Sequence, residues 1–203
     1  MHAFPVRLYF AGLMLLGLSG AALAAPGPTI ELCAACHGSD GMSYDAPLVP
    51  IIAGMPAPHI EEAINEYLDE ARQCIRIHTM CETASALDEA QTALAAEHFA
   101  KQPRLASEEE FDAALAANGA ALHASRCAVC HFAPDDPSVA SSLGIPLEGQ
   151  RKQYVRYAID AYMRGDRLML WDLMAGEIRV LTPDDLNALV NYYASYRQDQ
   201  PIP

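Results

Sequence analysis

The chain has 203 residues, of which 26 are acidic and 13 are lysine or arginine, so its net charge at pH 7 is −13. Such an acidic surface argues against nucleic acid and anionic membranes as partners, and it favours a basic or mixed-charge protein partner. The length alone allows either one domain or two small ones.

The first element is an apolar segment over residues 8–23, which follows Arg7 and ends in the small-residue pattern Ala22-Leu23-Ala24. Glycine and serine interrupt this segment, and it is shorter than the roughly 20 apolar residues that a bilayer span requires. The pattern is typical of a secretory signal peptide that is cleaved after Ala24. We therefore expect residues 1–24 to be removed and the mature protein to be periplasmic, without a membrane span.

Four of the six cysteines lie in two pentapeptides with the same spacing, Cys33-Ala34-Ala35-Cys36-His37 and Cys127-Ala128-Val129-Cys130-His131. Cys-x-x-Cys-His is the attachment motif of c-type haem, in which two thiols bond to one porphyrin and the histidine binds its iron. A zinc site made of two Cys-x-x-Cys pairs usually separates them by about 15 to 20 residues, whereas roughly ninety lie between these. The sequence therefore predicts two covalently bound haem c groups, attached through Cys33, Cys36, Cys127 and Cys130, with His37 and His131 as iron ligands.

An internal repeat accompanies the two motifs. When the chain is shifted along itself by 94 to 95 residues, the following pairs coincide: Ile52-Ala53-Gly54 with Leu147-Glu148-Gly149, Arg72 with Arg167, and His98-Phe99 with Tyr192-Tyr193. After the first of these pairs, apolar residues recur at i, i+3, i+4 and i+7, which is typical of an amphipathic helix. We predict an all-α protein with two tandem domains related by internal duplication, residues 25–103 and 104–203.

Two helix starts are predicted in the second domain. Ser107 with Glu110 has the spacing of a capping box, and Thr182 followed by Pro183 is typical of an N-cap and a first helical position. Each domain buries only a modest core by itself, so we expect a porphyrin to complete it.

An iron bound by one histidine needs a second axial ligand, which in an electron carrier is usually methionine. We predict Met80, in the loop after the middle helix of the first domain, and Met169, in the equivalent loop of the second. His78 is the histidine that competes with Met80. Met163 and Met174 are interpreted as core residues.

Cys74 and Cys81 lie outside the motifs. An exported protein is expected to pair spare thiols, so we predict a disulfide between them. This requires a non-helical chain between the two, because seven helical residues would separate the α carbons by about 10 Å. The alternative is that Cys81, adjacent to Met80, ligates the first haem as a thiolate.

The second half of the chain resembles a known family. The segments FDAALAANGAALHASRCAVCH, LEGQRKQYVRYAIDAYMRGDRLM and LNALVNYYASY look like the dihaem cytochrome subunit of flavocytochrome c sulfide dehydrogenase, a relative of the tandem dihaem class I cytochromes. CAACHGSDG in the first half is common to that whole group. The resemblance implies two class I cytochrome c domains, with Met80 and Met169 as distal ligands. It also implies an FAD-containing sulfide dehydrogenase subunit as electron donor, on a separate chain because no G-x-G-x-x-G fingerprint occurs here.

We therefore expect a periplasmic electron-transfer subunit that is not an enzyme by itself and that passes electrons to a small c-type cytochrome or an oxidase. Two alternatives stay open. One is a free dihaem carrier that serves a terminal oxidase or another sulfur enzyme. The other is a thiosulfate dehydrogenase-like haem enzyme that uses a thiolate ligand, for which Cys81 is the candidate.

Overall fold

The computed structural model describes residues 27–44, 46–105, 108–141, 144–169 and 171–197. The predicted signal peptide and its cleavage site lie outside these ranges. The described residues form helices and no strand, which confirms the all-α fold class. None of these helices is long and apolar enough to cross a membrane. In chain order they are α1 (Pro28–His37), α2 (Ala57–Leu68), α3 (Thr79–Ser85), α4 (Glu89–Ala100), α5 (Ala113–Arg126), the 3-10 helix η1 (Pro137–Ser141), α6 (Lys152–Arg164), α7 (Asp172–Arg179) and α8 (Pro183–Ala194).

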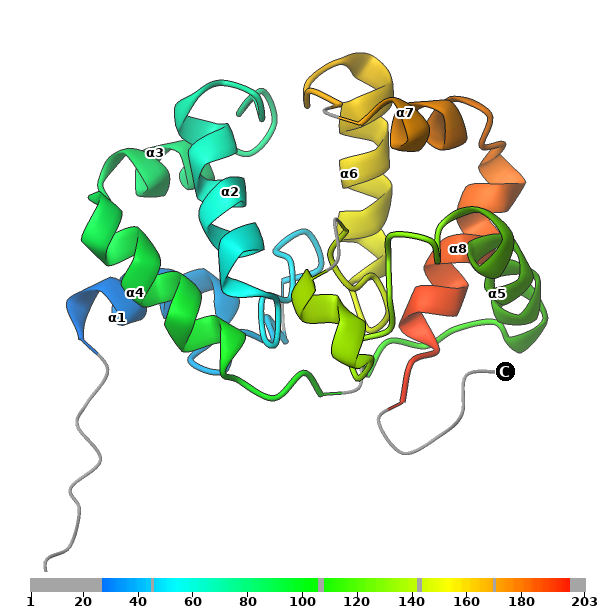
Figure 1. Cartoon of the computed structure of the whole chain (residues 1–203), viewed down its shortest axis with the longest axis horizontal. Helices are drawn as coiled ribbons and strands as arrows, with labels where there is room; N and C mark the ends of the chain where they lie inside the picture. Colours follow the sequence, from blue (N-terminus) through cyan, green and yellow to red (C-terminus); the bar gives the residue numbers. More distant parts are fainter. Residues whose placement is uncertain (1–26, 45, 106–107, 142–143, 170, 198–203) are drawn as a thin grey trace, which may run out of the picture.

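The helices form two groups that lie side by side (Figure 1). Helices α1 to α4 make up the first group, α5 to α8 make up the second, and the segment between α4 and α5 connects them along one edge. We call these groups the first and the second lobe. The predicted domain boundary, between residues 103 and 104, lies in the connecting segment and stays a prediction.

Each lobe has a small hydrophobic core of its own. In the first lobe the buried residues of this core are Ile30, Met55, Ile60, Ile64, Ala84, Ala95, Ala96 and Phe99. In the second lobe they are Val155, Leu189, Val190, Tyr192 and Tyr193. Ile60, Ile64 and Val155 belong to the apolar pattern that predicts the two middle helices, α2 and α6, so that pattern marks the core-facing sides.

The closing helix of each lobe begins with a capping box. Before α4, the Asp88 carboxylate accepts a hydrogen bond from the Gln91 N–H at 2.8 Å, and the Gln91 side chain accepts one from the Asp88 N–H at 2.9 Å. Thr182 and Asp185 make the equivalent two hydrogen bonds before α8, at 3.1 and 2.9 Å. The helix start predicted at Thr182 is confirmed. The two N-cap residues, Asp88 and Thr182, are 94 residues apart, so the two halves of the chain align with a shift of 94 residues in this part.

The helix start predicted at Ser107 with Glu110 is wrong. Helix α5 begins directly after Asp112, whose carboxylate accepts hydrogen bonds from two N–H groups of the first turn, at 2.8 and 3.0 Å. The preceding glutamates contact a different helix, since the Lys152 N–H at the start of α6 donates to Glu109 Oε2 at 2.9 Å. Ser107 itself lies outside the described residues.

In the second lobe, α5 and α8 cross at Gly119. A Cβ atom built there would lie 2.2 Å from the Ala188 carbonyl oxygen and 2.7 Å from Tyr192 Cβ, closer than side chains approach their neighbours. Any side chain at this position would push the two helices apart. Glycine is therefore required by the close approach of α8.

Replacing Gly119 with alanine is expected to lower the free energy of unfolding by about 1 to 3 kcal/mol, the usual cost of overpacking. Gly176 on α7 is the matched control, because a Cβ there meets nothing within 4 Å. Gly176→Ala should stabilise the protein by up to about 1 kcal/mol through helix propensity. Urea unfolding of both holoproteins measures the difference, and a midpoint for Gly119→Ala at or above the wild-type value would contradict it.

Segments related by the duplication pair with each other where the lobes meet. Arg72 and Arg167 form an isolated antiparallel bridge. Around it, the backbones of 71–73 and 166–168 exchange two hydrogen bonds, at 2.7 and 2.8 Å. Gln73 corresponds to Leu168 and Ala71 to Asp166 in the 95-residue repeat, so the duplication relates the two hydrogen bonds to each other. The lobes are thus related by an approximate twofold axis at this point.

Both bridging arginines bind the same carboxylate. Arg72 Nη2 and Arg167 Nη2 donate to Glu66 Oε2 at 2.5 and 3.0 Å. Each guanidinium also lies over a tyrosine of its own lobe, Tyr67 at 4.9 Å and Tyr162 at 4.5 Å from the ring centroid. Charge-assisted hydrogen bonds from both lobes therefore converge on one side chain.

Buried polar side chains of the second lobe bind the backbone of the first. The Gln150 amide accepts from the Ile51 N–H at 2.8 Å and donates to the Ile51 carbonyl at 2.9 Å. Arg151 Nη2 donates to the carbonyls of Met42, at 3.2 Å, and Ser43. Because these hydrogen bonds are shielded from water, they hold the two lobes in one relative position.

Candidate haem sites

The first Cys-x-x-Cys-His motif forms the end of α1. Cys33 and Cys36 are three residues apart on the helix, so their thiols lie on the same face. Both sulfurs are free thiols, Cys33 half-buried and Cys36 exposed. The helix ends at His37, and Gly38 follows with a φ of 79°, which favours glycine.

His37 is oriented by the loop that follows the motif. Its side chain is buried, and Nδ1 lies 2.9 Å from the Pro50 carbonyl oxygen. Because a carbonyl oxygen only accepts, Nδ1 carries the proton and donates. Burial lowers the pKa of His37, against the opposing effect of this hydrogen bond, so the imidazole is neutral at pH 7. Nε2 then keeps its lone pair, as a metal ligand requires.

The second motif repeats this arrangement after α5. Cys127 is the C-cap of α5, and the next residues continue as a turn in which the His131 N–H donates to the Cys127 carbonyl at 3.0 Å. His131 Nδ1 donates to the Ile145 carbonyl at 2.8 Å, and burial lowers the pKa of this imidazole as well. Pro50 and Ile145 are 95 residues apart, so the histidine and its partner carbonyl are duplicated together.

These residues fit covalently attached haem c. In each lobe one turn of chain presents two free thiols and a neutral histidine whose remaining nitrogen is available to iron. A backbone carbonyl on the other ring nitrogen fixes the tautomer and the ring orientation, as is usual for metal-binding histidines. Cys33, Cys36 and His37 would hold one group, and Cys127, Cys130 and His131 the other.

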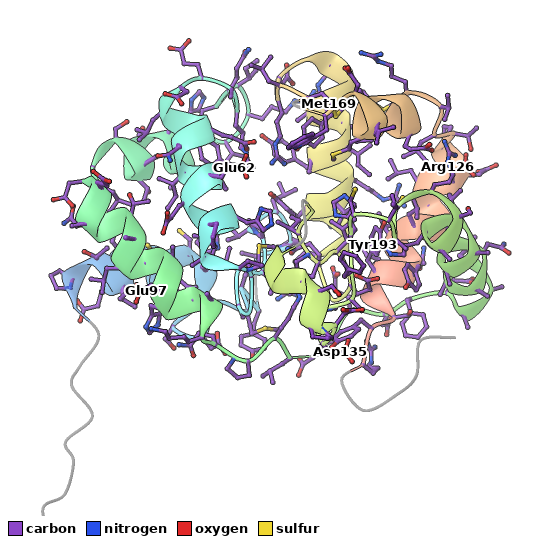
Figure 2. All side chains as sticks on the ribbon, viewed as in Figure 1. Glu62, Glu97, Arg126, Asp135, Met169 and Tyr193 are labelled. Atoms are coloured by element: carbon purple, nitrogen blue, oxygen red, sulfur yellow. A yellow bond between two sulfur atoms is a disulfide. The ribbon has the colours of Figure 1, made fainter. Side chains whose placement is uncertain are left out.

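The candidate methionines lie in different surroundings. Met80 is the second residue of α3 and is half-buried. Met169, also half-buried, lies between α6 and α7, beside the end of α6 in Figure 2. Met42 and Met55 are buried in the protein core. Met163, interpreted from the sequence as a core residue, is instead exposed at 52%.

The structure adds Met174 as a candidate in the second lobe. It lies on α7, which corresponds to α3, and it is half-buried. Met80 stands eight residues before the N-cap Asp88, and Met174 stands eight residues before the equivalent N-cap, Thr182. Met169 is five residues further from that N-cap. The two lobes thus place Met80 and Met174 at the same position.

The predicted disulfide between Cys74 and Cys81 is present, with the α carbons 6.2 Å apart. The chain between them is non-helical up to His78, as the prediction requires, and Cys81 lies in the first turn of α3. The sulfur of Cys81 is therefore part of a disulfide. This overturns the alternative in which Cys81 ligates the first haem as a thiolate.

A buried polar cluster in the second lobe has no counterpart among the described residues of the first. Glu148 Oε1 lies 3.2 Å from His123 Nε2 and accepts from the Tyr192 hydroxyl at 3.2 Å, while His123 Nδ1 lies 3.2 Å from the Tyr193 hydroxyl. The side chains of His123 and Glu148 are 5% and 2% exposed. Burial raises the pKa of Glu148 and lowers that of His123, so it disfavours the charged form of both groups.

Sequence reasoning singles out neither His123 nor Glu148. A signal was present in the repeat, because Glu148 falls on Ala53 and the Tyr192-Tyr193 pair falls on His98-Phe99. A glutamate at a position that is buried and apolar in the other lobe predicts a buried partner.

Comparison with known proteins places this chain among electron-transfer cytochromes. No protein-family model matches it. It is 30% identical over 180 residues to the thiosulfate dehydrogenase electron acceptor of Stutzerimonas stutzeri (strain A1501), which covers 85% of this chain and 82% of that relative.

Two solved structures share its fold. Reduced recombinant cytochrome c4 from Pseudomonas stutzeri matches with a TM-score of 0.66 and 22% identity, over 81% of this chain and 93% of that one. Thiosulfate dehydrogenase (TsdBA) from Marichromatium purpuratum matches with a TM-score of 0.63 and 23% identity, over 81% of this chain. The present chain spans only 36% of the length of that second structure.

Proposed function

Because the chain belongs to the dihaem c-type cytochromes, we propose that it is a periplasmic electron-transfer protein that accepts electrons from a sulfur-oxidising enzyme. The observation that carries this proposal is the duplicated Cys-x-x-Cys-His motif, in which each histidine donates Nδ1–H to a backbone carbonyl. Haem c supplies reversible one-electron chemistry when it is bound. The disulfide at Cys81 leaves no thiolate there for a catalytic haem, so electron relay is favoured over an enzyme.

The chain's own residues then have defined tasks. Two cysteines in each lobe fix one haem in place, and His37 and His131 bind iron in an orientation set by Pro50 and Ile145. The hydrogen bonds between the lobes keep the two sites at a constant separation, so transfer between them needs no movement of one lobe against the other. The acidic surface attracts a basic donor or acceptor.

For the sixth ligands we propose Met80 in the first lobe and, in the second, Met174 in place of the sequence prediction Met169. The support is the common position of Met80 and Met174 relative to the N-cap of the closing helix. A methionine sulfur favours ferrous iron and raises the reduction potential, as suits an electron acceptor.

Replacing Met174 with leucine is expected to remove about half of the far-red absorption band that methionine-ligated ferric haem gives, and to lower one of the two midpoint potentials. Met169→Leu is the matched control, because it removes the same thioether from the neighbouring loop and should leave both properties unchanged. Absorption spectra and a spectroelectrochemical titration of both holoproteins measure this. The reverse pattern would assign the ligand to Met169.

We propose thiosulfate dehydrogenase as the electron donor, because the Stutzerimonas stutzeri relative is an acceptor for that enzyme. A second candidate donor is a flavoprotein sulfide dehydrogenase subunit, which the resemblance of residues 111–131 and the closing helix to the flavocytochrome c subunit favours. A small c-type cytochrome or an oxidase would take the electrons onward in either case.

Stopped-flow spectroscopy distinguishes the donors. The oxidised holoprotein is mixed with thiosulfate and catalytic amounts of a thiosulfate dehydrogenase, or with sulfide and a flavoprotein sulfide dehydrogenase. We expect reduction of both haems to be faster in the first mixture, and to slow as ionic strength rises, because the acidic surface steers the encounter. Reduction that is no faster with either enzyme than with its substrate alone would contradict the proposed function.

A further inference from the structure

The Cys74–Cys81 disulfide is a feature of the first lobe that electron relay does not by itself require. It joins the segment after α2 to the first turn of α3, and Met80 directly precedes Cys81. The fastened turn is therefore the turn that carries the proposed sixth ligand.

Helix α3 buries few of its own side chains. Of its seven described residues only Ala84 is buried, and the side chain of its N-cap, His78, makes no capping hydrogen bond to the described residues. Helix α7, its counterpart, buries both Ala175 and Ile178. A short helix with one buried residue is expected to fray in water unless another contact fixes it.

The second lobe fastens α7 by a different contact. Arg126 Nε on α5 donates to Glu177 Oε2 on α7 at 2.5 Å, and Arg126 Nη2 donates to the Glu177 carbonyl at 3.3 Å. The residues 94 positions earlier are Leu32 and Thr83, which cannot form this ion pair. Conversely, Ala175 stands at the position of Cys81 and the segment 165–171 has no cysteine. The first lobe thus has the disulfide and lacks the ion pair, whereas the second lobe has the ion pair and lacks the disulfide.

The other end of the disulfide lies beside the junction between the lobes. Cys74 follows Gln73, whose N–H donates to the Asp166 carbonyl of the second lobe at 2.8 Å. The disulfide therefore connects the turn with Met80 to a backbone segment that the interface already holds in place.

We infer that the Cys74–Cys81 disulfide is a positioning element that keeps the Met80 sulfur on the iron of the first haem, the task that the Arg126–Glu177 ion pair performs for α7. This rests on the proposed function, in which Met80 is the sixth ligand. Without the disulfide, the first turn of α3 opens more often and the iron becomes accessible to an external ligand.

The test is cyanide binding to the ferric holoprotein. In the double variant Cys74→Ser/Cys81→Ser, the rate at which cyanide binds one of the two haems is expected to rise about tenfold or more, the scale of the constraint that a short disulfide loop imposes. The far-red methionine band and the midpoint potential of that haem should fall together. Glu82→Gln is the matched control, because Glu82 is an exposed neighbour of Cys81 on the same helix, and it should change none of these.

Unchanged cyanide kinetics and an unchanged far-red band in the double variant, with the absence of the disulfide confirmed by mass spectrometry, would overturn the inference. If the serine variant yields no holoprotein, Cys74→Ala/Cys81→Val fills the same space with apolar groups and is judged by the same two measurements. The variant Met80→Leu tests the ligand assignment separately from the positioning role of the disulfide. If it leaves the far-red band intact, Met80 is not the ligand and the ligand assignment fails. If it removes about half of the band while the double variant removes none of it, only the positioning role fails.

Discussion

Replacing Cys127 and Cys130 together with serine is expected to leave a protein with one haem instead of two and an unfolded second lobe. The main hydrophobic cluster of that lobe has five buried members, Val155, Leu189, Val190, Tyr192 and Tyr193. Lobes of fewer than about 100 residues bury too little apolar surface to be robust by themselves, and a covalent haem stabilises only the folded form. Intact mass gives the haem content, and limited proteolysis locates the unfolded part.

The control for this experiment lies inside the motif. Val129 is 78% exposed, so Val129→Ala removes apolar atoms without touching the two thiols and should retain both haems and protease resistance. Protection of residues 113–194 in the double serine variant at the wild-type level would contradict the prediction. So would an intact mass that still includes two haem groups.

Replacing Glu148 with alanine is expected to lower the free energy of unfolding by about 2 to 5 kcal/mol, because it leaves two buried polar groups, His123 and the Tyr192 hydroxyl, without their partner. Glu97→Gln changes a carboxylate that is 66% exposed, and it should cost no more than about 1 kcal/mol. Urea unfolding followed by circular dichroism measures both values.

A double variant shows whether the cost comes from the unpaired partner. Glu148→Leu/His123→Leu removes both members of the pair, so it is expected to be less destabilising than the sum of the two single leucine variants. Additive losses would mean that the two side chains do not interact in the folded protein. In that case the destabilisation would reflect packing alone.

Local patterns in the sequence predict the candidate haem sites, because the chemistry that they imply is local. Each motif places both thiols and the candidate iron ligand within five consecutive residues. These residues are 33–37 in the first lobe and 127–131 in the second. The helix start at Thr182 is local in the same sense, since its capping box spans four residues. The disulfide between Cys74 and Cys81 follows from a short spacing and a count of spare thiols.

The sequence by itself thus determined the all-α duplicated fold, the two candidate attachment motifs and the pairing of the spare cysteines. Tertiary structure decided what depends on residues far apart in the chain. Alignment of Met174 with Met80 needs the positions of α3 and α7, because the repeat changes from 95 to 94 residues between Arg72 and Asp88. The contact of His123 with Glu148 joins helix α5 to the loop before α6, and the hydrogen bonds from Gln150 to Ile51 join loops of the two lobes. Periodicity shows that a side chain is buried, whereas only packing determines which polar group it meets there.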